Sequence, residues 1–306
     1  MANQIKTIFL LGVLSALLIG VGQVVSPAHT STYLVMAAVM NLGAYFFSDR
    51  MVLRISGARE VSVVEAPELH TMVDELARRA GIPKPKVYVI QQKQPNAFAT
   101  GRNPAHGVVA VTTGLVEMLD RREIRAVLAH EIGHIAHRDI LISSIAAMMA
   151  AAIGYAAQSL MFAGMFGGRR SDSEGGGNAA AGLLVMLVAP MAAMLVQMGI
   201  SRSREYLADE AGAEFSGEPE ALASALQKLQ HYAEAIPADV VPATASLYIV
   251  NPLAGGARLA KLFSTHPSTQ ERVERLMAMA AEMRTSGGMR AGRGGLTAGS
   301  SSSARR

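Results

Sequence analysis

Uncharged apolar stretches alternate along this chain with segments that carry most of its charge. The longest of these stretches lie at residues 8–25, 33–47, 140–166 and 179–200. A helix needs about 20 residues to cross a hydrocarbon core of about 30 Å, so the second stretch spans a bilayer only if it includes the neutral residues 29–32. The pattern predicts a mainly α-helical integral membrane protein with about four transmembrane helices in two hairpins.

Two of these stretches have other interpretations. The first follows Lys6 and precedes Ser-Pro-Ala at residues 26–28, as in a signal peptide. Its apolar region exceeds the usual length of about 7–15 residues, and another apolar stretch follows at once, which favours a retained hairpin. The third is rich in alanine and would also suit a buried helix of a soluble domain, although its length favours a span.

Lysine and arginine are distributed unevenly around the predicted spans. They are frequent between residues 50 and 138 and absent from the loop at residues 26–32. Because basic loops stay on the cytoplasmic side of a membrane, both termini are expected in the cytoplasm. Arg169 and Arg170 lie in a loop expected outside and oppose this orientation, but the larger basic segments outweigh them.

The composition narrows the chemistry that is available. Half of the residues are hydrophobic, cysteine is absent and the formal net charge is +4. Without cysteine there are no disulfides or thiolate ligands, so any metal must be bound by histidine and carboxylates. The positive charge suits a surface next to anionic lipid, and no interleaving of basic and aromatic residues indicates nucleic acid as a partner.

The charged segment between the hairpins has the periodicity of a small α+β domain. Residues 67–80 place apolar side chains on one helical face and end before Gly81. Residues 87–90 and 108–112 are apolar and β-branched, as in short strands. Later in the chain, an amphipathic helix is expected beyond Glu218.

The next predicted helix contains His-Glu-Ile-Gly-His at residues 130–134, after a capping pair at Asp120 and Glu123. His130 and His134 are four residues apart, which places both imidazoles on one helical face within reach of one metal ion. Glu131 is then placed to take a proton from a metal-bound water. The pattern alone is common, and a charged face with two solvated histidines is the alternative.

A catalytic zinc ion usually has three protein ligands, so a third is required. Glu205 and Asp209 follow the fourth apolar stretch at helical spacing; the first could bind the metal and the second could orient a histidine. His137 lies roughly 7–8 Å along the helix from the midpoint of the two histidines, too far for a shared ion. It is expected to interact with the helix C-terminus.

Glu205 can reach the two histidines only if an even number of spans separates the segments, and two are predicted. The five expected segments are an N-terminal hairpin, a first half-domain with the histidine motif, a second hairpin, a second half-domain with the third ligand, and a disordered tail rich in Gly, Ser and Arg. They occupy residues 1–49, 50–139, 140–200, 201–285 and 286–306.

The motif residues resemble peptidase family M48 and, within it, the bacterial HtpX branch. The resemblance extends from the N-terminal hairpin to about residue 275 and is carried by residues 96–99, 130–134, 205–209 and 264–267. It implies a zincin-like domain on the cytoplasmic face of a bacterial inner membrane. Such an enzyme would degrade misfolded or damaged membrane proteins as part of quality control.

The resemblance also implies a role for individual residues. One zinc ion per subunit would be bound by His130, His134 and Glu205. Glu131 would be the catalytic base, and Asp209 would support the site. His266 would stabilise the tetrahedral intermediate with Arg272 supporting it, although a plain surface histidine is the alternative for His266.

The segment of Asn96, Ala97, Phe98 and Ala99 is expected either to bind extended substrate through its main chain, as an edge strand, or to be an ordinary structural strand. The resemblance favours the first.

Other classes of function are weighed against the endopeptidase. An intramembrane protease would place the motif helix inside the bilayer, but Arg121, Arg122 and Arg125 precede the motif. A non-enzymatic scaffold or metal-handling protein would have no use for Glu131. A prenyl-protein endopeptidase would carry more spans. Two histidines and a glutamate would also hold cobalt or manganese, and the sequence does not specify an oligomeric state.

Overall fold

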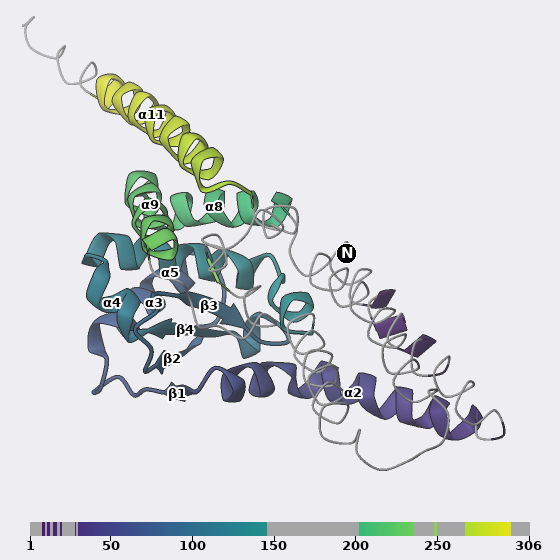
Figure 1. Cartoon of the computed structure of the whole chain (residues 1–306). Coiled ribbons are helices and arrows are strands. Elements are labelled where there is room, and N and C mark those ends of the chain that lie inside the picture. Colours follow the sequence, from purple (N-terminus) through teal and green to yellow (C-terminus); the bar gives the residue numbers. More distant parts are fainter. Residues whose placement is uncertain are drawn as a thin grey trace, which may run out of the picture.

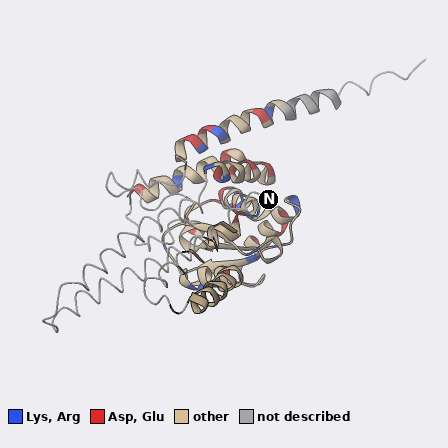
Figure 2. Cartoon of the chain, turned by 90° about the vertical axis from the view of Figure 1, so that its right-hand side faces the viewer, with Lys and Arg blue, Asp and Glu red and all other residues tan. Residues whose placement is uncertain are grey.

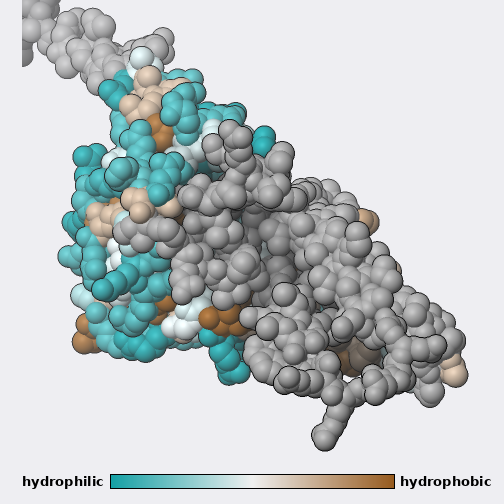
Figure 3. All heavy atoms as spheres, viewed as in Figure 1, coloured by the Kyte–Doolittle hydropathy of each residue, from teal (hydrophilic) through white to brown (hydrophobic). Residues whose placement is uncertain are grey.

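The computed structural model describes residues 30–145, 202–235, 248–249 and 267–294, with a few single positions before residue 30, and side chains up to residue 285. Helices predominate and pack around one mixed sheet, from which the long helix α2 extends away (Figure 1). The described surface around the sheet is mostly hydrophilic with scattered apolar residues (Figure 3).

The helices are α2 (Thr30–Ile55), α3 (Pro67–Arg79), α4 (Thr113–Met118), α5 (Arg121–Ala136), α8 (Arg202–Ser216), α9 (Pro219–Ala235) and α11 (Thr269–Gly294), with a short 3₁₀ turn η2 (Pro104–His106). The strands are β1 (Ala58–Glu60), β2 (Lys86–Ile90), β3 (Ala97–Thr100) and β4 (Val108–Thr112). The helices expected at residues 67–80, after Asp120 and beyond Glu218 are confirmed, as are the strands at 87–90 and 108–112. The short strand β1 was not expected.

Within the described residues, α2 alone is long and apolar enough to cross a membrane. Its buried side chains fall mainly on one face, at Ala37, Ala44, Ser48 and Val52. Asn41 donates to the hydroxyl oxygen of Ser15 at 2.7 Å, so the first apolar stretch contacts α2, as small and polar residues often permit between membrane helices. Residues 146–201, with most of the third and fourth apolar stretches, lie outside the described residues.

The sheet has the order β1-β2-β4-β3, with β2 and β4 parallel and the other two pairs antiparallel. β3 is therefore an edge strand of the described sheet. The Thr112 N–H donates to the Asn96 carbonyl at 2.9 Å. Peptide groups alternate in direction along an antiparallel strand, so those of Ala97 and Ala99 point away from β4.

The end of α2 is joined to one face of this sheet. Val52 and Leu53, in the last turns of α2, pack in an apolar cluster with Ile90, Phe98 and Val108 from three of the strands. Burying such side chains contributes about 1.5–3 kcal/mol each. The apolar helix and the sheet are thus parts of one packed unit.

The opposite face of the sheet is covered by α5, whose first turn is fixed by side chains. Asp120 accepts from the Glu123 N–H at 2.9 Å and Glu123 accepts from the Asp120 N–H, the reciprocal capping box that the sequence predicted. Glu123 is buried and also accepts from Ser224 and Lys228 of α9. One carboxylate therefore caps α5 and anchors α9.

α5 and α8 cross closely because glycines stand at the contact. A Cβ atom added at Gly133 would lie 2.9 Å from the Ala211 Cβ, and one added at Gly212 would lie 3.1 Å from the His130 backbone. Larger side chains would force the two helices apart. This approach brings the histidines of α5 next to the acidic residues of α8.

α11 differs from expectation at its end. The helix continues to Gly294, nine residues into the tail for which composition predicted disorder. A helix already nucleated by packing against α8 and α9 extends at little cost, since each added residue gains a hydrogen bond. Charged residues of both signs are distributed along its described part (Figure 2).

Candidate metal centre

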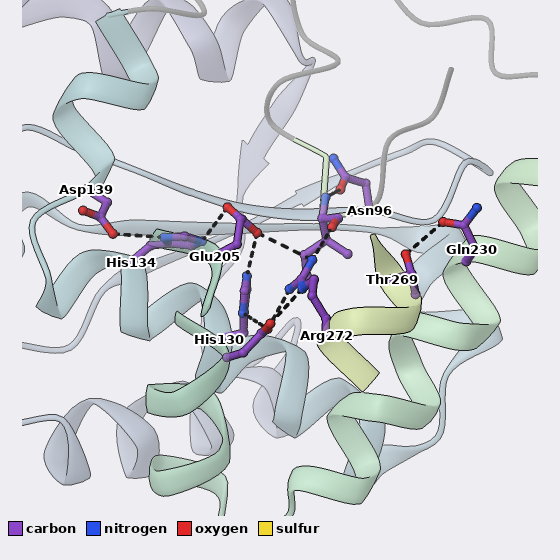
Figure 4. A network of polar contacts seen from close by, with 10 residues as sticks. Asn96, His130, His134, Asp139, Glu205, Gln230, Thr269 and Arg272 are labelled. Carbon is purple, nitrogen blue, oxygen red and sulfur yellow. Dashed lines mark hydrogen bonds and ion pairs between the residues drawn. The ribbon is translucent and has the colours of Figure 1, made fainter. Parts of the chain in front are cut away.

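Three side chains that can bind metal converge where α5 crosses α8. The two oxygens of Glu205 face the two histidines, with Oε2 at 3.8 Å from His130 Nε2 and Oε1 at 3.7 Å from His134 Nε2 (Figure 4). All three ligand atoms lie within 4.8 Å of one another. Ligand atoms around tetrahedral zinc lie about 3.4 Å apart for bonds near 2.1 Å, so the cluster has nearly the dimensions of a metal site.

Each imidazole ring has a carboxylate next to its Nδ1 atom and presents its Nε2 atom to Glu205. The Nδ1 atom of His130 lies 3.0 Å from Asp209 Oδ1, although the alignment falls short of a hydrogen bond. The Nδ1 atom of His134 lies 3.4 Å from Asp139 Oδ2. Carboxylates that hold one ring nitrogen leave Nε2 free for a metal, which fits the donor set to a divalent ion.

Asp209 is held in turn by Arg272 of α11, which is fully buried. Its guanidinium donates to both carboxylate oxygens of Asp209, at 2.7 and 2.8 Å, and to the Ile249 carbonyl at 2.9 Å. It also lies 3.5 Å from Glu205. Burial alone would raise the pKa of Asp209, but the guanidinium outweighs it and the pKa is lowered, so Asp209 stays ionised.

Asp139 reaches His134 through a turn that sequence reasoning missed. Arg138 has a φ of 59°, an uncommon left-handed conformation for a residue with a side chain. The turn allows the Asp139 N–H to donate to the His134 carbonyl at 2.9 Å, and Asp139 is buried beside the ring. The pKa of His134 is lowered by burial, but Asp139, Glu205 and Glu131 outweigh this and raise it to about 9.

Glu131 is buried next to the cluster and faces the edge strand. Its carboxylate accepts a hydrogen bond from the Ala99 backbone, on the side of β3 that points away from β4. Burial raises the pKa of Glu131, while the two histidines oppose the rise and Glu205 adds to it. A carboxylate with a raised pKa can both accept and return protons near neutral pH.

The structure brings together most of the residues that the sequence singled out. The metal candidates His130, His134 and Glu205 converge. Asp209 lies next to His130, Arg272 lies next to Glu205, and the buried Glu131 is close to all three. Asn96 to Ala99 form or adjoin β3, beside Glu131. His137 is the C-cap residue of α5, at the helix end where the sequence analysis expected it. His266 lies outside the described residues.

The burial of two further charged residues was not predicted from the sequence. Arg204 is buried on α8, where desolvation lowers its pKa while Asp139 and Glu205 raise it. Glu123 was predicted only as a cap and proves to be buried between two helices. The signal for Arg204 was its place beside Glu205, directly after an apolar stretch, and no local pattern marks Asp139.

A helix that carries two histidines and a glutamate, facing a buried glutamate on a second helix, defines a metallopeptidase site. Residues 64–280 match the family model described as "Peptidase family M48". The chain belongs to peptidase family M48.

Three curated relatives are each described as a protease HtpX homolog. The one from Methylibium petroleiphilum is 52% identical over 283 residues, covering 91% of this chain and 98% of the relative. Those from Thermodesulfovibrio yellowstonii and Ralstonia pickettii are 54% and 53% identical, covering 91% and 92% of this chain and 99% and 98% of the relative. The crystal structure of S. mikatae Ste24p is 21% identical with a TM-score of 0.48, covering 90% of this chain and 65% of that one.

Proposed function

We propose that this M48 metalloprotease is a zinc-dependent endopeptidase that cleaves misfolded or damaged membrane proteins on the cytoplasmic side of a bacterial inner membrane. The observation that carries the proposal is the convergence of His130, His134 and Glu205 beside the buried carboxylate of Glu131. The likeness to proteases described as HtpX homologs over nearly their whole length supports it. The apolar helix α2 supports the membrane location.

The donor set fits zinc. Two imidazole nitrogens and one carboxylate are the ligands of many catalytic zinc sites. Here Asp209 and Asp139 lie beside the two imidazoles, as carboxylates often do next to metal-binding histidines. When bound, zinc would act as a Lewis acid that lowers the pKa of a water and polarises the scissile carbonyl.

Glu131 supplies the proton transfers. Its carboxylate takes a proton from the attacking water and returns it to the amine of the leaving peptide, so that one residue is base and then acid. The raised pKa caused by burial suits both steps. His266 is proposed to stabilise the intermediate, and the contacts of Arg272 favour support of Asp209 and Glu205 rather than direct contact with substrate.

The outward edge of β3 is proposed to bind the substrate. The peptide groups of Ala97 and Ala99 point away from β4 toward the side where Glu131 lies. An extended polypeptide adding to this edge would pair with the main chain of β3, largely independent of its side chains. Such binding suits unfolded segments of many proteins and cleavage at internal bonds.

We propose for this arrangement the domain division that the sequence predicts. Residues 50–139 supply the histidines and residues 201–285 supply the glutamate, on either side of a proposed second hairpin at 140–200. An even number of spans returns the chain to the same side of the membrane, as the contact between His134 and Glu205 requires. The prenyl-protein endopeptidase alternative is weaker, because the curated relatives are HtpX homologs.

The test compares metal content and cleavage of an unfolded polypeptide by the detergent-purified chain and three variants. Glu131→Gln should retain about one zinc per chain but lose cleavage, by at least about 100-fold given typical acid–base contributions. Glu205→Ala should lose both zinc and cleavage. Glu210→Ala, which changes an exposed glutamate on the same helix, should behave as the native chain.

If Glu131→Gln binds zinc and cleaves as well as the native chain, the catalytic assignment is wrong. A native chain that binds zinc without cleaving any unfolded polypeptide would instead favour the metal-handling alternative.

A further inference from the structure

The apolar part of α2 ends at a recognisable point in the sequence of the helix. Tyr45, Phe46 and Phe47 are exposed aromatic residues at the end of the uncharged stretch, and Asp49 and Arg50 are its first charges. Aromatic residues followed by charged ones are typical of the boundary between hydrocarbon and water. The membrane surface therefore lies at the level of these residues.

The substrate-binding strand lies at nearly the same level. Arg102, two residues after the end of β3, has its guanidinium 5.8 Å from the centre of the Phe46 ring. Phe98 in β3 packs in one apolar cluster with Val52 and Leu53, which follow Arg50 by less than one turn of α2. Both contacts place β3 directly against the part of α2 that emerges from the membrane.

The distance from this level to the catalytic base is short. The Ala99 backbone binds the Glu131 carboxylate, and Ala99 and Arg102 are three residues apart, which is at most about 10 Å of extended chain. The reacting bond must lie next to Glu131, so its height above the membrane surface is at most that length plus the reach of the Arg102 side chain and its 5.8 Å separation from the Phe46 ring.

The positions of the metal candidates in the sequence also indicate a short distance between the site and the membrane. The third apolar stretch begins at Ile140, six residues after His134, and the fourth ends at Ile200, five residues before Glu205. Even when fully extended, these separations span at most about 17–20 Å of chain. Thr100 of β3 and Ser144, within the third stretch, share a hydrogen bond of 2.7 Å, which ties the strand to the start of that stretch.

From these contacts we infer that the substrate class is the juxtamembrane segment: the first few residues of a polypeptide outside the bilayer in which it is anchored. This inference rests on the proposed function and specifies how far from the membrane surface the cleaved bond lies. Fewer than about 10 extended residues span the distance from the surface to Glu131, including those that lie along β3. A chain just leaving the bilayer thus reaches the site directly, whereas a more distant segment must fold back and close a loop.

The experiment uses the full chain and a substrate reconstituted together in lipid vesicles. The substrate is one membrane-spanning helix followed by an unfolded tail of identical short polar repeats, so that every repeat offers the same bonds. Cut positions are read by mass spectrometry at early times. The closest cuts should fall within about 10 residues of the last apolar residue, and the first repeats should be cut most often.

The same tail without its membrane helix is the control. If the free tail is cut evenly along its repeats while the anchored tail is cut nowhere within about 20 residues of the membrane, the inferred height is wrong and the proposed function stands. If neither tail is cut, or Glu131→Gln cuts both as well as the native chain, the proposed function itself fails.

Discussion

The orientation of each histidine depends on a different carboxylate, and only one of these was predictable. Asp209 follows Glu205 by one helical turn, so its place near the site follows from helical spacing alone. Asp139 lies beyond the end of α5, and it returns to His134 only because Arg138 adopts a left-handed conformation. Backbone conformation of that kind has no reliable signal at an arginine.

Removal of the Asp139 carboxylate should weaken the metal site without unfolding the protein. We expect Asp139→Ala to lower zinc affinity by about 10–100-fold, because the ring of His134 loses the group that holds its Nδ1 atom. The zinc affinity of Asp139→Asn should lie between those of Asp139→Ala and the native chain, since an amide oxygen keeps part of the interaction. Competition with a chromophoric chelator measures the affinity.

The control for this change is Asp74→Ala, which removes a partly exposed aspartate of α3 that pairs only with Arg78 among the ion pairs of the described residues. Its zinc affinity should equal that of the native chain. Equal affinity in Asp139→Ala would show that Asp139 does not position His134.

Arg138 offers a direct test of the turn. Glycine adopts a φ of 59° without the steric cost that other residues bear, about 1–2 kcal/mol. We expect Arg138→Gly to raise the thermal midpoint of the purified chain or leave it unchanged. His137→Gly, at a neighbouring residue with a φ of −79°, should lower it, since glycine there adds only flexibility.

At the level of elements, the sequence predicted α5 well and its partner only in part. The capping box and the apolar periodicity define α5 locally, so both its start and the histidine face could be derived. The crossing with α8 depends on two glycines about 80 residues apart in the chain, and no local pattern pairs them. The four strands were mostly foreseen, but their order was not, because pairing is a property of the folded sheet.

The closeness of α5 and α8 should be essential for the site. Gly133→Ala places a Cβ 2.9 Å from the Ala211 Cβ, and we expect a loss of about 1–3 kcal/mol in stability together with weaker zinc binding. Adding Ala211→Gly removes the opposing atom and should restore both. A double variant as impaired as Gly133→Ala would locate the damage elsewhere. Denaturant unfolding and zinc titration supply the two readouts.

An acid-sensitive contact joins three helices at the edge of the domain. Arg125 of α5 donates to Glu75 of α3 at 2.9 Å and to the Ser216 carbonyl of α8 at 2.6 Å. The hydrogen bond from Arg125 holds the pKa of Glu75 below its ordinary value of 4.5. A carboxylate with a lowered pKa in the folded state stabilises the protein above its unfolded pKa, and this contribution disappears as the pH falls.

We therefore expect Glu75→Gln to be less stable than the native chain at pH 7, by a difference that shrinks as the pH falls below 4.5 toward pH 3. The difference should be modest, because the Glu75 side chain is 41% exposed and solvent screens the pair. Thermal unfolding of both proteins across this pH range measures it. A difference that persists unchanged at pH 3 would mean that charge is not its cause.

At the scale of the whole molecule, the sequence alone predicted which segments meet in the fold. His134, the last residue of the histidine motif, and Glu205 are 71 residues apart, and within the chain itself only the even number of intervening apolar stretches indicated that they could meet. Composition was a poorer guide at the tail, where α11 persists to Gly294. Helical continuation from a packed segment is decided by neighbours rather than by the local Gly and Arg content.

The position of β3 at the edge of the described sheet also bears on aggregation. Exposed sheet edges invite other sheets to pair with them and so promote aggregation. All four residues of β3 are nonetheless buried, with none more than 8% exposed. Because this edge is covered, a neighbouring sheet cannot pair with β3 unless the covering segments move aside. The cover would thus limit aggregation through this edge, and binding of an extended substrate at β3 would require the same movement.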